Sequence, residues 1–118
     1  LQRLRRKSWL ALGRVQAFLM PRFSVYANAE GVGYLVDVQA NLLSHLNTRM
    51  VVPLLPADRA PLPAQTLNPI FDVDGVRHVL VTQFMAAVPD RLLKTKVFDA
   101  LDRSHDIIAA MDCLFQGV

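Results

Sequence analysis

The chain has 118 residues, 53% of them hydrophobic and 19% charged, so it is long enough for one small globular domain and too apolar to be disordered. The formal net charge of +3 is uneven: residues 1–19 carry five basic side chains and no acid, while residues 20–118 carry eight basic and ten acidic ones. One cysteine, Cys113, excludes an intrachain disulfide, and the mildly acidic body argues against a domain that grips nucleic acid.

Residues 1–19 form a basic extension, for which three interpretations exist. Leu4, Trp9 and other apolar residues could form one side of an amphipathic helix for a membrane or nucleic acid. A targeting peptide is disfavoured, because Arg14 interrupts the apolar stretch and a small-residue cleavage site is missing. We favour a mis-called start or an incidental extension, since Met20 directly precedes a clean strand pattern. The functional domain is then expected to span residues 20–118. No apolar run approaches the ~18 residues that cross a bilayer, so no membrane-spanning segment is expected. The domain is expected to have no membrane partner.

The first expected elements are two strands joined by a turn. Residues 23–27 alternate in a period of two, Glu30-Gly31-Val32-Gly33 predicts a turn, and Tyr34 to Val38 predicts the returning strand of a hairpin. Arg49 to Leu55 predicts a third strand that is apolar on both sides and therefore buried. Pro53 within it indicates a bulge or a sheet edge, because proline lacks a ladder donor.

A loop and a second hairpin follow. Three prolines predict a loop over residues 56–63. Leu67 to Val73 and Val76 to Gln83 then flank Asp74-Gly75, a pair that suits the positive φ angles of a type I′ turn.

After Pro89 the apolar spacing becomes helical. Asp99 or Asp102 is expected to cap a helix running to about Phe115. Its apolar stripe is expected to pack on the core, with Cys113 beside it as a packed thiol. A short tip suited to insertion into a partner would follow. Strands followed by one terminal helix predict a mostly β fold, a small barrel or curled antiparallel sheet with the helix against it. The expected stripe consists of Ile107, Ile108, Met111, Leu114 and Phe115.

The sequence predicts no catalytic or metal site. His45, His78 and His105 lack ligand spacing, and neither a phosphate-binding glycine loop nor a nucleophile elbow is present. Asp72 and Asp74 are interpreted as turn acids, and Asp99, Asp102 and Asp106 as acids at the start of the helix. We therefore expect a binding protein without cofactor or metal, and not an enzyme.

An ordered set of short motifs resembles the CcdB family, the toxins of bacterial type II toxin–antitoxin modules. The resemblance covers Met20 to Val118, and residues 1–19 match nothing in it. The motifs are Phe23-Ser24-Val25-Tyr26, Tyr34-Leu35-Val36-Asp37-Val38-Gln39, Arg49-Met50-Val51-Val52-Pro53-Leu54, Leu67-Asn68-Pro69 and Phe115-Gln116-Gly117-Val118.

This resemblance implies a homodimer with an SH3-like barrel and a C-terminal helix. It also implies a protein of the bacterial cytoplasm with a role such as plasmid maintenance. Family members bind the A subunit of DNA gyrase and trap the enzyme on cleaved DNA, and a CcdA-like antitoxin strips them off. The family's gyrase-binding element is a final Trp-Gly-Ile. Carried over, it corresponds to Gln116, Gly117 and Val118, with glutamine where the family has tryptophan.

Three hypotheses on function follow. The first is a gyrase-poisoning toxin. The second is a CcdB-like protein that dimerises and binds antitoxin but poisons gyrase weakly or not at all. The third is an endoribonuclease, because MazF-type RNases share this barrel. RNA cleavage would need a general base and a basic groove, and the acidic body argues against it.

Overall fold

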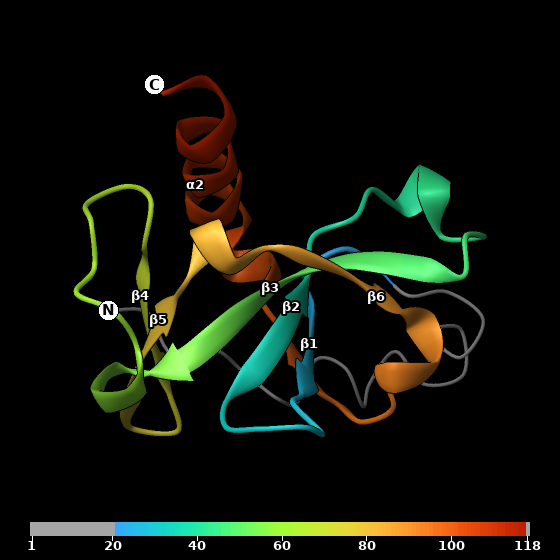
Figure 1. Cartoon of the computed structure of the whole chain (residues 1–118), viewed down its shortest axis with the longest axis horizontal. Helices are drawn as coiled ribbons and strands as arrows, with labels where there is room; N and C mark the ends of the chain where they lie inside the picture. The colour runs from blue at the N-terminus through green and yellow to red at the C-terminus, as the bar shows by residue number, and fades with distance from the viewer. Residues whose placement is uncertain (1–20, 118) are drawn as a thin grey trace.

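The computed structural model of the chain describes residues 21–117, which build a curled antiparallel sheet with a helix at its C-terminal end (Figure 1). Neighbouring strands follow the order β4-β5-β3-β2-β1-β7, and β6 pairs with β3 beside β5. This is the mostly β architecture with one terminal helix that the sequence predicts. The strands are β1 (Ser24–Ala27), β2 (Tyr34–Asp37), β3 (Thr48–Pro56), β4 (Ile70–Val73), β5 (Val76–Leu80), β6 (Ala86–Pro89) and β7 (Lys96–Asp99), and the helix is α2 (Ser104–Gln116).

The first hairpin is confirmed. Strands β1 and β2 pair antiparallel, with Val25 opposite Val36. Gly33, which begins the return, has φ +81°, and a Cβ at this position would collide with the carbonyl oxygen of Leu54 on β3. Only glycine fits both the positive φ and the close approach of the neighbouring strand.

Strand β3 lies in the middle of the sheet and is buried on both faces, as predicted. Val52 belongs to the main core cluster, which also contains Phe71, Phe98 and Ile107, whereas Val51 lies in a smaller cluster on the other face. Alternate side chains of a strand point to opposite faces, so both clusters draw on the same strand.

Pro53 occupies no sheet edge, which corrects one of the two alternatives drawn from the sequence. On one side β3 pairs with β2 from Val51 to Leu54, and Pro53 lies opposite Leu35. On the other side it pairs with β6 up to Val51 and with β5 from Leu54 onward. Pro53 lies at this change of partner, where its carbonyl accepts a hydrogen bond from Val81 N at 2.9 Å. A residue without an N–H is tolerated because the ladder is interrupted there.

The second hairpin is also confirmed. Asp74 and Gly75 have φ of 53° and 82°, as a type I′ turn requires, and Gly75 N donates to Asp72 Oδ1 at 2.7 Å. Both strands are shorter than predicted. Before β4, the buried side chain of Asn68 donates a hydrogen bond to Leu80 O, so this residue lies outside the strand. After β5, the chain turns into the 3₁₀ turn η4 (Thr82–Phe84).

The region after Pro89 differs from the prediction, because strand β7 and two 3₁₀ turns, η5 (Asp90–Leu92) and η6 (Leu101–Arg103), precede the helix. Asp99 lies in β7, where its Oδ1 accepts a hydrogen bond from Leu101 N, and neither Asp99 nor Asp102 caps the helix. The N-cap position is Arg103, and no side chain caps it. Neither β6 (Ala-Ala-Val-Pro) nor β7 (Lys-Val-Phe-Asp) alternates apolar and polar residues, so no period of two marks these strands in the sequence. Within residues 21–117, no helix has the length and apolar character that crossing a bilayer requires.

Candidate protein-binding site on the C-terminal helix

Helix α2 is attached to the sheet by its first half. Ile107 and Ala110 are completely buried, and the partly buried Met111 packs against the same core cluster. These residues are three and four apart, so they lie along one line of the helix. Beyond them the helix rises away from the sheet, and its far end stands clear of the body (Figure 1).

The expected apolar stripe is therefore only partly in the core, which corrects the prediction. Ile107 is buried and Leu114 is half-buried, but Ile108 is 38% exposed and Phe115 is 70% exposed. A helical period identifies an apolar face, but it does not say how far the opposing sheet extends. Phe115 thus joins the exposed end of the helix, a placement that helical periodicity could not reveal.

The end of α2 is an open tip. Gln116 and Gly117 are exposed. Gly117 has the left-handed φ of 73° and donates its N–H to Cys113 O at 3.0 Å, which closes the helix. A Cβ at Gly117 would have no atom within 4 Å. Of the predicted site residues, Gln116 and Gly117 lie together at this tip, and Val118 lies outside the described residues.

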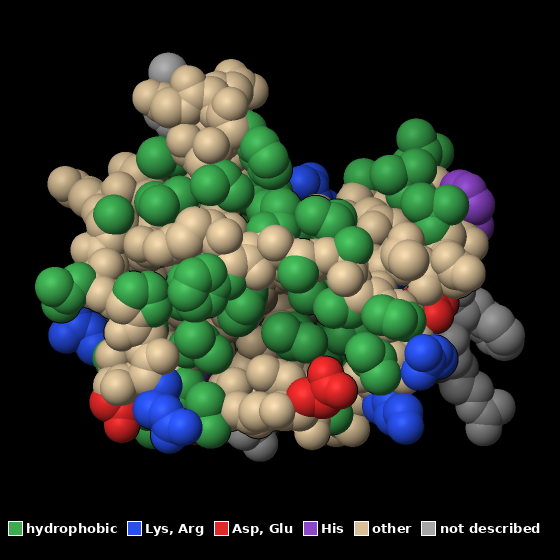
Figure 2. All heavy atoms as spheres, in the orientation of Figure 1, with side chains coloured by type: hydrophobic (Ala, Val, Ile, Leu, Met, Phe, Trp, Pro, Cys, Tyr) green, Lys and Arg blue, Asp and Glu red, His purple; other side chains and the backbone are tan. Residues whose placement is uncertain are grey.

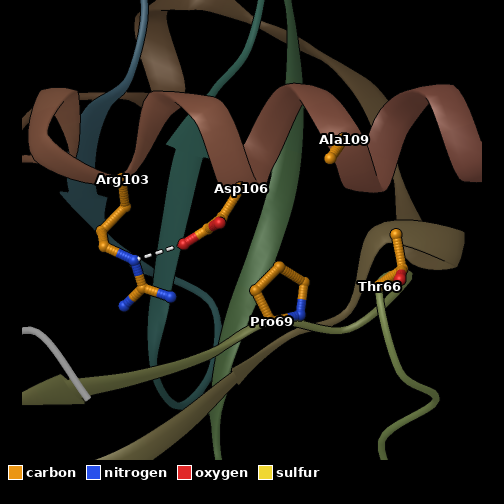
Figure 3. A pocket seen from close by; sticks show the side chains of 5 residues that line it. All are labelled: Thr66, Pro69, Arg103, Asp106 and Ala109. Atoms are coloured by element: carbon orange, nitrogen blue, oxygen red, sulfur yellow. Dashed lines mark hydrogen bonds and ion pairs between the residues drawn. The ribbon is translucent and has the colours of Figure 1, made fainter.

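The base of α2 is tied to the sheet edge by Arg103. Its Nε lies 2.8 Å from Asp106 Oδ2, and its Nη1 donates to Ile70 O on β4 at 3.3 Å. Next to this contact is a cleft of about 350 Å³ between α2 and the loop before β4 (Figure 3). Its lining residues are Thr66, Pro69, Arg103, Asp106 and Ala109.

Two exposed apolar surfaces accompany the tip. One joins η4, β6 and the neighbouring part of α2, with Phe84 52% exposed, and Figure 2 shows hydrophobic side chains in a band across this face. The other is on the turn after β2, where Leu42, Leu43 and Leu46 are 86%, 42% and 40% exposed. That turn projects toward the same side of the sheet as α2 (Figure 1).

The three histidines of residues 21–117 lie in different environments. His45 and His105 are exposed, while His78 is buried with its Nδ1 2.9 Å from Val76 O. Between residues 21 and 117 no group of three or more His, Cys, Asp or Glu side chains could hold a metal ion. Cys113 is half-buried in the last turns of α2.

The most buried charges form an ion pair inside the protein. Arg49 Nη2 and Asp37 Oδ2 are 2.7 Å apart, and both side chains are 0% exposed. Burial, together with the nearby Asp37, raises the pKa of the adjacent Tyr26 phenol to about 12. Because its side chain is completely buried, Arg49 cannot reach an RNA phosphate in this structure.

One comparison with known proteins bears on this geometry. A family model described as "CcdB protein" matches residues 22–117. The match covers every strand of the sheet, the whole of α2 and the exposed Gly117.

Proposed function

This chain belongs to the CcdB family, the toxins of type II toxin–antitoxin modules, and we propose that it acts by binding the A subunit of DNA gyrase and trapping the enzyme on cleaved DNA. CcdB proteins are protein inhibitors, not enzymes, so the proposed action is protein–protein binding in the bacterial cytoplasm. A CcdA-like antitoxin is the proposed neutralising partner.

The observation that carries the proposal is the freestanding end of α2. Phe115, Gln116 and Gly117 are exposed in consecutive positions, and α2 lifts them clear of the sheet. This is the segment in which the family places its gyrase-binding element. Gly117 supports insertion, because a residue without a side chain permits close backbone approach to a partner.

Gln116 is the feature most relevant to the strength of poisoning. The family has tryptophan at this position, and losing a large aromatic from an interface costs about 2 kcal/mol or more. The exposed ring of Phe115 supplies aromatic area one residue earlier. We propose that Phe115 carries part of the contact that the family assigns to tryptophan.

We also propose that two copies associate through the surface of η4, β6 and Ile108. An exposed phenylalanine on a mainly apolar face suits contact with a second copy. This face runs beside α2 without including the tip, so dimerisation leaves Gln116 and Gly117 accessible.

The test compares the full chain with two variants, one ending at Phe115 and one carrying Gln116→Trp. Growth of gyrase-proficient bacteria and cleavage of DNA by purified gyrase are measured for each. We expect the chain to arrest growth, the shortened variant to lose this effect and Gln116→Trp to strengthen it. Leu62→Trp is the matched control, because it adds the same ring at a loop position that is 94% exposed.

Two outcomes would count against the proposal. If the shortened variant arrests growth as well as the full chain, the tip is not the active element. If neither the chain nor Gln116→Trp affects growth or gyrase cleavage, the protein is a CcdB-like binder of antitoxin that does not poison gyrase.

A further inference from the structure

Arg103 makes three different contacts at the point where α2 leaves the sheet. Its guanidinium bonds Asp106 in the first turn of α2 and Ile70 O on β4, as described above. Its Cζ also lies 4.1 Å from the ring centre of Phe71, a cation–π contact. The Arg103 side chain is only 11% exposed. Because Phe71 is itself completely buried, Arg103 links the start of the helix to a fixed part of the core.

The other buried contacts of α2 lie on one face of the helix. Ile107 and Ala110 are completely buried, and Met111 packs against the same core cluster, so these contacts hold one face and not the flanks. On one flank, Ala109 lines the cleft together with Thr66 and Pro69 (Figure 3). On this side Arg103 supplies polar contacts that oppose a tilt of the helix.

A small tilt at the base becomes a large displacement at the tip. Arg103 and Gly117 are 14 residues apart, which corresponds to about 21 Å along an α-helix. A rotation of about 5° at Arg103 would move Gly117 by about 2 Å. A displacement of that size is enough to misplace a side chain in an interface that depends on shape complementarity.

We propose that Arg103 is a positioning residue, which fixes the direction of α2 and thereby places Phe115, Gln116 and Gly117 for the partner. The proposal rests on the proposed function for the identity of that partner, the A subunit of gyrase. Arg103 does not touch the partner. It acts through the helix, and it requires the planar guanidinium, which can meet Asp106, Ile70 O and Phe71 at once.

The direction of α2 is measured in the full chain with two spin labels. Cys113→Ser removes the natural cysteine, and Arg77→Cys on β5 and Gln116→Cys at the tip carry the labels. Labelled protein is diluted with excess unlabelled chain, so that distances between copies do not contribute. We expect Arg103→Met to displace or broaden the distance distribution. Arg103→Lys should give an intermediate result, because lysine keeps the positive charge but lacks the planar guanidinium that meets all three groups at once.

Two substitutions serve as controls. Arg59→Met makes the same change at an exposed arginine on the 3₁₀ turn η3 (Ala57–Arg59), and we expect it to leave the distribution unchanged. Asp106→Asn removes the negative charge that pairs with Arg103 but keeps an oxygen that can accept its hydrogen bond. We therefore expect a smaller effect than that of Arg103→Met.

Affinity for the A subunit of gyrase is then measured on unlabelled chains without the cysteine changes. We expect Arg103→Met to weaken binding by about tenfold or more, because a helix that is no longer preorganised must be ordered on binding. Thermal unfolding and circular dichroism should show the fold retained.

An unchanged distance distribution in Arg103→Met would overturn the proposal, whatever happens to gyrase binding. So would a displaced helix that binds gyrase with unchanged affinity. If the unsubstituted chain does not bind gyrase, the proposed function fails, while the distances still decide whether Arg103 directs the helix. If Arg103→Met and Arg103→Lys both fail to fold, Arg103 supports the whole domain and the positioning role is overturned.

Discussion

Among single residues, the buried ion pair and its phenol neighbour are the most sensitive to solution conditions. Asp37 Oδ2 accepts from Arg49, Asp37 Oδ1 accepts from Gln39 N at 3.0 Å, and Tyr26 lies 5% exposed beside them. Burying charges is tolerated when they are paired and hydrogen-bonded, as here. Deprotonating Tyr26 would add a negative charge where the protein has no room to solvate it.

Stability is therefore expected to fall at alkaline pH through Tyr26. The pKa of Tyr26 is about 12 in the folded protein, against 10.0 for a free phenol, so the folded state keeps a proton that the unfolded chain loses. Its contribution is fully present below about pH 10 and is lost as pH rises toward 12. Urea unfolding at about pH 8 and about pH 11 should show a larger loss for the unsubstituted chain than for Tyr26→Phe. Tyr34→Phe, the matched control, should retain the full alkaline loss, and equal losses in all three proteins would contradict the prediction.

Phe115 is the residue whose role changed most between sequence and structure. Because its ring is 70% exposed, Phe115→Ala should change the free energy of unfolding by no more than about 0.5 kcal/mol. Binding to the A subunit of gyrase should weaken by about tenfold or more, as for an interface aromatic. Calorimetric titration and urea unfolding measure the two effects. Leu62→Ala, at another exposed apolar position, should change neither, and a large loss of stability in Phe115→Ala would place the ring in a buried contact.

Among the elements, the first hairpin depends on one backbone position. Gly33→Ala should lower the free energy of unfolding by about 3 kcal/mol, because the methyl group would meet Leu54 O and the residue would keep a left-handed φ. Gly117→Ala is the control, since its φ is also positive but the space around it is empty, and about 1 kcal/mol or less is expected there. Urea unfolding compares the two. Equal costs would mean that β3 yields to the added methyl group.

At the scale of the whole molecule, the apolar face beside α2 predicts self-association. We expect the full chain to sediment as a dimer at about 10 µM, and Phe84→Glu to shift it to monomer, because a carboxylate is costly to bury in an apolar contact. Val76→Glu places the same charge at a position that is also 52% exposed, at the β4–β5 hairpin, and should leave the dimer intact. Sedimentation velocity decides, and a monomeric unsubstituted chain would refute the expectation.

The domain boundary is a second prediction at this scale. The proposed domain begins at residue 20, and the family match begins at residue 22. Deleting residues 1–19 should therefore change the melting temperature by less than about 5 °C, a shift that corresponds to ~1 kcal/mol in a domain of this size. Scanning calorimetry of both chains tests this, and a larger decrease would show that the extension packs on the domain.

The amino-acid sequence by itself determined the features that depend on neighbouring residues. Asp74-Gly75 specifies its turn because the two residues tolerate positive φ, and the period of two over residues 23–27, followed by a glycine-containing turn, specifies the first hairpin. The order of the motifs likewise indicated the family that the match over residues 22–117 shows. The turn signal, the first hairpin and each single motif lie within short stretches of consecutive residues.

Only the tertiary structure decided where α2 stops being part of the core. The helical period treats Ile107 and Phe115 alike, yet Ile107 is buried and Phe115 is exposed, because the sheet ends beneath the first turns of the helix. Strand β7 could not be predicted from the sequence either, because it pairs with residues about 70 positions earlier. The same holds for Arg103, which contacts the ring of Phe71, 32 positions earlier. Contacts between distant parts of a chain depend on how its elements pack, and no local pattern records that.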